Sequence, residues 1–267
     1  GDDEVIVIDS NTDKILERIA VGASLHLAHV ALTPDSSYAF VTAQTKGVIY
    51  KINARTFEVE KEISMPASKE NLASQEPHGI RIAPDGLTAY FAVLKGKSLG
   101  ILDLKTDAVS VLPLDGSAVQ TGITPDGKLV VASLYDTKQL AVYNIATKQI
   151  KNIKLPKEAK GPIQMFATPD SRFMYLADQG YYFNQPASEW VYKVDLQKME
   201  VAKEIKAGNA PHGVVVSKDG TRVYITNLLS GDVSIIDTAR DLEIGRIKVG
   251  KEPNGISIWY KTTKPLE

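Results

Sequence analysis

The sequence predicts an all-β fold, a β-propeller of six blades with four antiparallel strands in each blade. Two segments that recur along the 267 residues carry this prediction, together with many Val and Ile residues and the lack of a long helical periodicity. Self-similarity at a period of this length is typical of structural units that bury their faces by stacking on their neighbours.

The first recurring segment is a pair of strands joined by a turn of the Thr-Pro-Asp-Gly type. This turn recurs in steps of 50, 41, 44 and 49 residues, at Pro34, Pro84, Pro125, Pro169 and Lys218. Pro presets the backbone of such a turn, Asp accepts from nearby amides, and Gly adopts the left-handed conformation. We expect these turns to join strands A and B, the two strands of each blade nearest the propeller axis.

The second recurring segment is a hairpin in which an apolar strand ends in Asp or Asn before a four-residue turn. The six strand-ending residues are Asp9, Asn53, Asp103, Asn144, Asp195 and Asp237. Because Asp and Asn cap turns with their own side chains, we assign these residues a structural role. The hairpins predict strands C and D of each blade.

The two ends of the chain each supply part of a blade. Residues 3–22 read as a C–D pair, whereas 253–260 read as an A strand, so we expect them to form one composite blade that closes the ring. An equivalent of strand B is missing, so this blade has three strands or its fourth lies upstream of Gly1. The expected single domain, 1–267, has blades at 29–66, 78–115, 118–156, 161–207, 212–249 and 253–260 with 3–22.

Composition excludes several classes of protein. A net charge of -1 with interspersed signs gives no basic surface for nucleic acid, and the absence of Cys excludes disulfides, thiolate metal sites and covalent haem attachment. No apolar run reaches the ~18 residues of a membrane span. Since strand structure is predicted within a few residues of Gly1, we expect a periplasmic, secreted or cell-surface monomer whose signal peptide has been removed.

The recurring segments resemble the YVTN-type β-propeller repeat family over essentially the whole chain. The best match is GNAPHGVVVSKDGTRVYITNLLSGDVSIIDTARDLEIGRIKVG at 208–250, and EPHGIRIAPDGLTAYFA and EPNGISIWY share its Pro-x-Gly entry. Lys218 replaces the turn Pro, and the unit at 116–127 lacks Pro-x-Gly. The resemblance implies relatives among surface-layer proteins, the haem domain of nitrite reductases and lactonase-like propellers. Because these relatives differ in activity, the fold does not supply a function.

Functional loops are expected on the face formed by the D–A and B–C connections, where loop length varies. Two of these connections, 64–77 and 179–190, are longer than their counterparts, and the second is rich in aromatic residues. Such rings either form a contact surface or fold back as a small satellite core. The predicted partner-binding face comprises Tyr181, Tyr182, Phe183, Trp190, Glu70, Asn71 and Asn254.

All four histidines are expected near one mouth of the central channel. His78 and His212 are the middle residues of Pro-x-Gly, while His26 and His29 precede the equivalent strand of another blade. Imidazole ligates transition metals and haem iron, but it also serves as a mid-sized polar ring that binds channel water. Any metal site would be one-sided, because Val119 stands at an equivalent position.

The sequence carries no phosphate-binding loop, nucleophile elbow or zinc-protease helix. We therefore expect a non-catalytic binding or scaffold module without a cofactor, holding a protein or cell-surface partner. The first alternative is a metal- or haem-associated redox or metal-handling propeller that uses the histidines. The second is a calcium-dependent, lactonase-like hydrolase centred on Asp178, Asn227 and Asn254.

Overall fold

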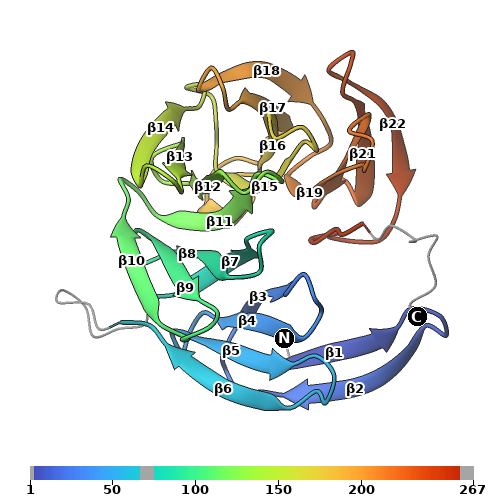
Figure 1. Ribbon diagram of the computed structural model, residues 1–267. Coiled ribbons are helices and arrows are strands. Elements are labelled where there is room, and N and C mark those ends of the chain that lie inside the picture. Colours follow the sequence, from blue (N-terminus) through green and yellow to red (C-terminus); the bar gives the residue numbers. More distant parts are fainter. Residues whose placement is uncertain (1–2, 67–74, 259–267) are drawn as a thin grey trace. The chain divides into compact units, whose positions relative to one another are not determined.

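The computed structural model describes residues 3–66 and 75–258 and contains, in these ranges, 22 strands and one short 3₁₀ helix (Figure 1). The all-β prediction is confirmed. The chain divides into two compact units, residues 1–123 and 124–267. The single-domain organisation stays a prediction.

Unit 1 contains the first eleven strands, which form antiparallel hairpins within each sheet. They are β1 (Glu4–Asp9), β2 (Lys14–Ala20), β3 (Leu27–Leu32), β4 (Tyr38–Ala43), β5 (Val48–Asn53), β6 (Val59–Ser64), β7 (Pro77–Ile82), β8 (Thr88–Val93), β9 (Ser98–Asp103), β10 (Val109–Pro113) and β11 (Ala118–Ile123).

Unit 2 contains the remaining strands and the 3₁₀ helix η1. They are β12 (Leu129–Leu134), β13 (Gln139–Asn144), β14 (Gln149–Lys154), β15 (Pro162–Ala167), β16 (Phe173–Asp178), η1 (Tyr181–Phe183), β17 (Trp190–Asp195), β18 (Glu200–Lys206), β19 (Pro211–Val216), β20 (Arg222–Asn227), β21 (Asp232–Asp237) and β22 (Leu242–Lys248).

The strands form one sheet for each predicted blade. Five sheets have four strands in sequence order, β3 to β6, β7 to β10, β11 to β14, β15 to β18 and β19 to β22, and β1 and β2 form a two-stranded sheet. This order matches the predicted A–B–C–D succession. No helix in the described ranges is long and apolar enough to cross a membrane.

The turns between first and second strands are built as the sequence predicts. The Asp35 carboxylate accepts from the Ser37 amide at 3.1 Å, and Asp219 accepts from the Thr221 amide at 3.0 Å. Hydroxyl donors, above all Thr33 for Asp35 and Ser217 for Asp219, lower the pKa of both carboxyl groups from 3.8 to about 2, and these amide bonds add to the lowering. Gly220 has φ +72, the left-handed conformation that the turn requires.

The C–D hairpin turns confirm the structural role of the strand-ending Asp and Asn residues. Asp237 Oδ1 accepts from the amides of Ala239 and Arg240, both at 3.0 Å. The same type of bond to an amide two or three residues on is made by Asp9, Asn53, Asp103, Asn144 and Asp195.

Four of the first strands, β3, β7, β15 and β19, contain a β-bulge that the repeat pattern did not predict. In β7, Pro77 pairs with Val93 and Ile80 pairs with Phe91, so two residues oppose one residue of β8. The same irregularity occurs in β3, β15 and β19. In β7 and β19 the two bulged residues are the x and Gly of Pro-x-Gly, whereas β3 and β15 carry other residues there. A bulge re-aims the side chains it contains.

The segment after β22 occupies the place of a first strand although 253–258 form no strand. Thr226 Oγ1 donates to the Asn254 carbonyl at 2.8 Å. Within unit 1, Thr42 Oγ1 donates in the same way to the His78 carbonyl at 2.7 Å. Asn254 therefore takes the position that His78 holds, as predicted for the composite blade, while 259 and 260 lie outside the described residues.

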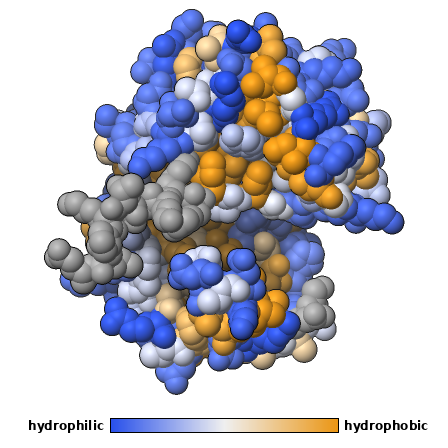
Figure 2. Space-filling view, turned by 90° about the vertical axis from the view of Figure 1, so that its right-hand side faces the viewer, coloured by the Kyte–Doolittle hydropathy of each residue, from blue (hydrophilic) through white to orange (hydrophobic). Residues whose placement is uncertain are grey.

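One face of β22 is uncovered in the described part of unit 2. Ile247, which pairs with Val233, is 49% exposed. The residues at its position in other sheets are buried, namely Ile19, Ile63, Ile153 and Ile205. Figure 2 views the side of the molecule where β22 lies and shows apolar surface among the polar surface there.

Candidate functional site

A cluster of polar and aromatic side chains in unit 2 is formed around His212, which the bulge of β19 carries. His212 is only 4% exposed, and the Tyr182 ring stands edge-on to it at 5.6 Å. Asn254 Nδ2 donates to Tyr182 Oη at 3.3 Å. The structure thus brings together Tyr182, His212 and Asn254, three residues that the sequence predicted separately. We call these residues and Gln164 the His212 cluster.

Gln164 determines which ring nitrogen of His212 carries the proton. Its amide nitrogen lies 3.3 Å from His212 Nδ1. Because an amide nitrogen only donates, Nδ1 accepts and the neutral ring carries its proton on Nε2. The sequence did not single out Gln164, because the position after x is Gly in three of the six repeats and Gln in two of them, Gln120 and Gln164.

The loop 179–190 is tied to the sheet and divides its aromatic rings between two roles. The backbone amide of Tyr182 donates a hydrogen bond to Gln179 Oε1 at 3.1 Å, and the backbone amide of Ser188 donates one to the Gln179 carbonyl at 3.0 Å. Phe183 folds back and stacks on Tyr135 at 4.1 Å. The satellite-core interpretation therefore holds for Phe183.

The two tyrosines of η1 remain at the surface. Tyr181 and Tyr182 are each 49% exposed, and their ring centroids lie 6.0 Å apart. Burial, together with the carboxylate of Glu252, raises the pKa of Tyr182, so its hydroxyl stays protonated near neutral pH. These rings match the contact-surface interpretation.

Trp190 does not belong to the His212 cluster. It is the first residue of β17 and is partly exposed. Its side chain borders a separate cleft of about 370 Å³ that Lys160 and Asn209 also line.

In unit 1, His78 takes the position equivalent to His212 but has different neighbours. Its Nδ1 donates to the Val119 carbonyl at 2.7 Å, which leaves the lone pair on Nε2. The His29 ring stands edge-on at 5.1 Å. Burial lowers the pKa of His78, so the imidazole is held neutral.

His29 lies inside β3 rather than before it, which corrects the prediction. It is the second bulged residue, equivalent to Gly79. His26 does precede the strand, with φ +49, and its amide donates to Asp3 at 3.1 Å.

The fit of a metal or haem to these histidines is limited. Within the described ranges, no three or more His, Cys, Asp or Glu side chains gather where one metal ion could be held. The rings of His29 and His78 stand edge to face with centroids 5.1 Å apart, so a porphyrin does not fit between them as it does between two axial ligands. The pair offers at most two imidazole ligands to a metal.

Asp178 and Asn227, proposed above as calcium ligands, use their oxygens to anchor loops. Asp178 is fully buried and accepts from the amides of Lys160 and Gly161 at 2.6–3.0 Å. Asn227 accepts from the Gly208 amide at 3.2 Å and donates to Asp232 at 2.8 Å. The calcium-dependent hydrolase gains no support from these residues.

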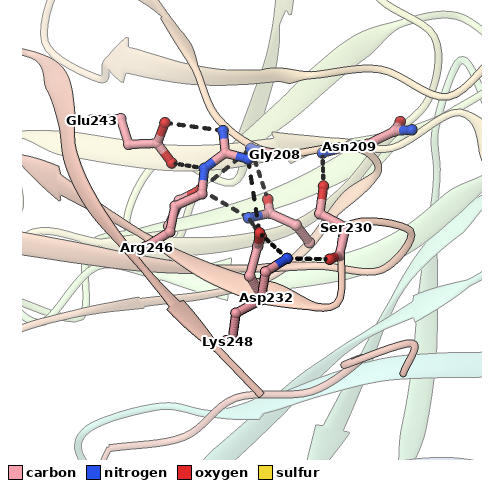
Figure 3. A network of polar contacts seen from close by, with 9 residues as sticks. Gly208, Asn209, Ser230, Asp232, Glu243, Arg246 and Lys248 are labelled. Atoms are coloured by element: carbon pink, nitrogen blue, oxygen red, sulfur yellow. Dashed lines mark hydrogen bonds and ion pairs between the residues drawn. The ribbon is translucent and has the colours of Figure 1, made fainter. Parts of the chain in front are cut away.

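Asp232 extends this anchor into a network of charges behind the loop (Figure 3). Its carboxylate is buried and lies 3.3 Å from Lys248 Nζ and 3.8 Å from Arg246 Nη1. The network fixes the loop that carries Asn209, whose backbone amide donates to Ser230 Oγ at 2.7 Å. Glu70 and Asn71, the remaining predicted contact residues, lie outside the described residues.

Comparison with known families gives one match over most of the chain. The family model described as the YNCE-like β-propeller matches residues 61–264. The YncE protein of Salmonella typhimurium is 32% identical over 90 residues, 34% of this chain and 22% of that protein. The dihydro-heme d1 dehydrogenase of Pseudomonas aeruginosa is 31% identical over 88 residues, 33% of this chain and 16% of the enzyme. The matched segments thus span less than a quarter of these relatives.

Solved structures share the fold at low sequence identity. The hydrazine synthase of Kuenenia stuttgartiensis superposes with a TM-score of 0.79 at 20% identity, covering 95% of this chain and 82% of the other. The virginiamycin B lyase of Staphylococcus aureus gives a TM-score of 0.79 at 14% identity, covering 96% and 82%. At such identities the likeness concerns the fold alone.

Proposed function

The chain belongs to the YNCE-like β-propeller family, and we propose that it acts as a non-catalytic binding module for a protein or cell-surface partner outside the cytoplasm. The proposal rests on one observation above all. Tyr181 and Tyr182 are half-exposed in a loop whose backbone is anchored by Gln179. Exposed aromatic rings on an ordered backbone are costly in water and are typical of binding surfaces.

The surroundings of the two tyrosines favour recognition rather than catalysis. The Tyr182 ring packs on His212, and its hydroxyl accepts a hydrogen bond from Asn254. The ring is therefore held in one orientation before a partner binds. Such preorganisation lowers the conformational entropy lost on binding. His212 itself is buried, and we assign it to positioning Tyr182.

Photo-cross-linking followed by affinity measurement tests this proposal. A photoreactive residue at exposed Gln185 is expected to capture a partner in the source cells, whereas the same residue at Gln197, in the C–D turn, is not. The captured partner is then produced and titrated calorimetrically. We expect the Tyr181→Ala, Tyr182→Ala double variant to bind at least about tenfold more weakly, ~1.4 kcal/mol.

A single Gln197→Ala variant is the matched control and should bind as the unmodified protein does. Equal affinity of the double variant and the unmodified protein would contradict the proposal, as would cross-linking of the same partners from Gln197.

A second candidate function is metal handling through the histidines of unit 1. The edge contact between His29 and His78 supports it, since two neighbouring imidazoles can share a transition metal. Equilibrium dialysis against Zn²⁺, Cu²⁺ and Ni²⁺ would show a stoichiometric site that the His29→Ala, His78→Ala double variant loses. Binding that persists in that variant would reject this candidate.

A further inference from the structure

A cleft in unit 2, apart from the His212 cluster, has the dimensions and the chemistry of a small-ligand site. Its volume of about 370 Å³ falls within the ~300–1,000 Å³ typical of such sites. Three connections form its walls, and the residues that face it include Glu158, Lys160, Ser188, Glu189, Trp190 and Asn209.

The walls of the cleft are held by hydrogen bonds before any ligand binds. The Lys160 amide donates to Asp178, and the Ala210 amide donates to the Ser188 carbonyl at 2.8 Å. The Trp190 amide donates to Ser188 Oγ at 3.2 Å. A site with an ordered backbone loses little entropy on binding.

Asn209 is presented to solvent by the network shown in Figure 3. Its backbone amide is fixed by Ser230 at 2.7 Å, while its side chain points away from Asp232, Arg246 and Lys248. The side-chain amide, which both donates and accepts, is thereby left on the cleft side of the loop.

The charges around the cleft nearly cancel. Glu189 pairs with Lys206 at 3.1 Å, and Glu158 faces the same space as Lys160. A strongly anionic ligand would meet two carboxylates and a strongly cationic one would meet two ammonium groups. The balance favours a neutral ligand that offers many donors and acceptors.

The indole of Trp190 adds a flat apolar platform, since 36% of the residue is exposed. The negative face of an aromatic ring attracts polarised C–H groups. A sugar ring offers C–H groups on its face and hydroxyls around its edge, which match the indole and the polar rim. We propose that this cleft binds a neutral saccharide, with Trp190 as the stacking platform and Glu158, Lys160 and Asn209 as hydrogen-bonding groups.

The fluorescence of Trp190 tests this inference directly. The chain has two tryptophans, so the Trp259→Phe variant isolates the emission of Trp190. The probes are tetrasaccharides of glucose, galactose and N-acetylglucosamine, with a tetrauronate and spermine as charged comparisons. We expect at least one neutral tetrasaccharide to shift the emission saturably, and neither charged compound to do so.

Calorimetry on two variants then assigns the binding to the cleft. Trp190→Ala should lower the affinity for the saccharide by at least about tenfold, and Asn209→Ala by about five- to tenfold. Asn209 is exposed, so the second variant tests the site even if Trp190→Ala fails to fold. Gln197→Ala, on a turn away from the cleft, is the control and should leave the affinity unchanged.

Three results would overturn the inference: no emission shift with any neutral tetrasaccharide, a shift with the charged compounds alone, or unchanged affinity in both variants. The inference does not depend on the partner proposed above, because that partner is tested through Tyr181 and Tyr182.

Discussion

His78 in unit 1 and His212 in unit 2 occupy the same position of the repeat but carry their protons on opposite nitrogens. His78 Nδ1 donates to the Val119 carbonyl, whereas His212 Nδ1 accepts from the Gln164 amide. The bulge presents both rings in the same way, so the difference comes from the group that the neighbouring strand supplies. The repeat fixes where the imidazole lies, and a single neighbour decides what it can bind.

The two positions also differ in what covers them. His212 lies beneath Tyr182 of the loop 179–190, whereas His78 meets the ring of His29. A polar position common to the repeat becomes a candidate binding site only in unit 2, where an aromatic loop adds exposed apolar surface.

The largest expected effect comes from filling the space beside His78. A Cβ on Gly79 would lie 1.7 Å from Gln120 Oε1 and 2.7 Å from the Gln120 Cα, so β7 would have to move. We expect Gly79→Ala to lower the free energy of unfolding by about 2–3 kcal/mol and to break the His78–Val119 bond. Chemical denaturation measures this change.

Gly255 provides the matched control for Gly79. It stands at the same position of the repeat, but a Cβ there meets no atom of residues 3–66 or 75–258 within 4 Å. Gly255→Ala should therefore change stability by less than about 0.5 kcal/mol. If both variants lost the same free energy of unfolding, the close contact with Gln120 would not be the cause of the loss in Gly79→Ala.

A smaller effect is expected from removing the donor of His78. His78→Leu would leave the buried Val119 carbonyl unsatisfied, at a cost of about 1–3 kcal/mol, whereas His78→Gln keeps an N–H donor. Calorimetric melting of both variants at pH 8 measures the difference. A Gln variant as unstable as the Leu variant would contradict the role of this bond.

The same histidine should make stability depend on pH. Because the pKa of His78 is lowered by burial, the unfolded chain takes up the proton first as the pH falls below 6.5. The stability that the neutral ring provides is complete above pH 6.5 and is lost below it. His26 adds to this lowering and Glu76 opposes it. In His78→Gln the loss of stability between pH 6.5 and 5 should be shallower.

The smallest expected effect is that of Tyr182→Phe, which removes only the hydroxyl that Asn254 contacts. The ring is half-exposed, so the loss of this 3.3 Å bond should cost about 0.5–1 kcal/mol. Partner binding should weaken less than in the Tyr181→Ala, Tyr182→Ala variant, because both rings remain. If Tyr182→Phe lost more stability than His78→Leu, the expectation that the His78 bond contributes more than the Tyr182 bond would be wrong.

The periodicity of the sequence was sufficient to predict the sheets and both kinds of turn. Asp35 and Asp237 cap turns through local bonds that depend on a few adjacent residues, and such bonds can be read from sequence. The bulges of β3, β7, β15 and β19 were missed because a register shift depends on how each strand pairs with the second strand of its sheet. That shift is also why His29 lies inside β3.

Contacts between sheets were beyond prediction from one repeat. The approach of Gln164 to His212 joins residues 48 positions apart, and the approach of Asn254 to Tyr182 joins residues 72 apart. The sequence offered two interpretations of the aromatic loop, and packing assigned one to Phe183 and the other to Tyr181 and Tyr182.

We expect a partner to bind over the His212 cluster and not over His78. Nitrogen-15 NMR of histidine-labelled protein tests this expectation. Spectra are recorded with and without the partner that cross-linking has identified. The free protein should show His78 protonated on Nδ1 and His212 protonated on Nε2. On binding, the signals of His212 should shift while those of His29 and His78 stay unchanged. Shifts of His78 with His212 unaffected would contradict the claim.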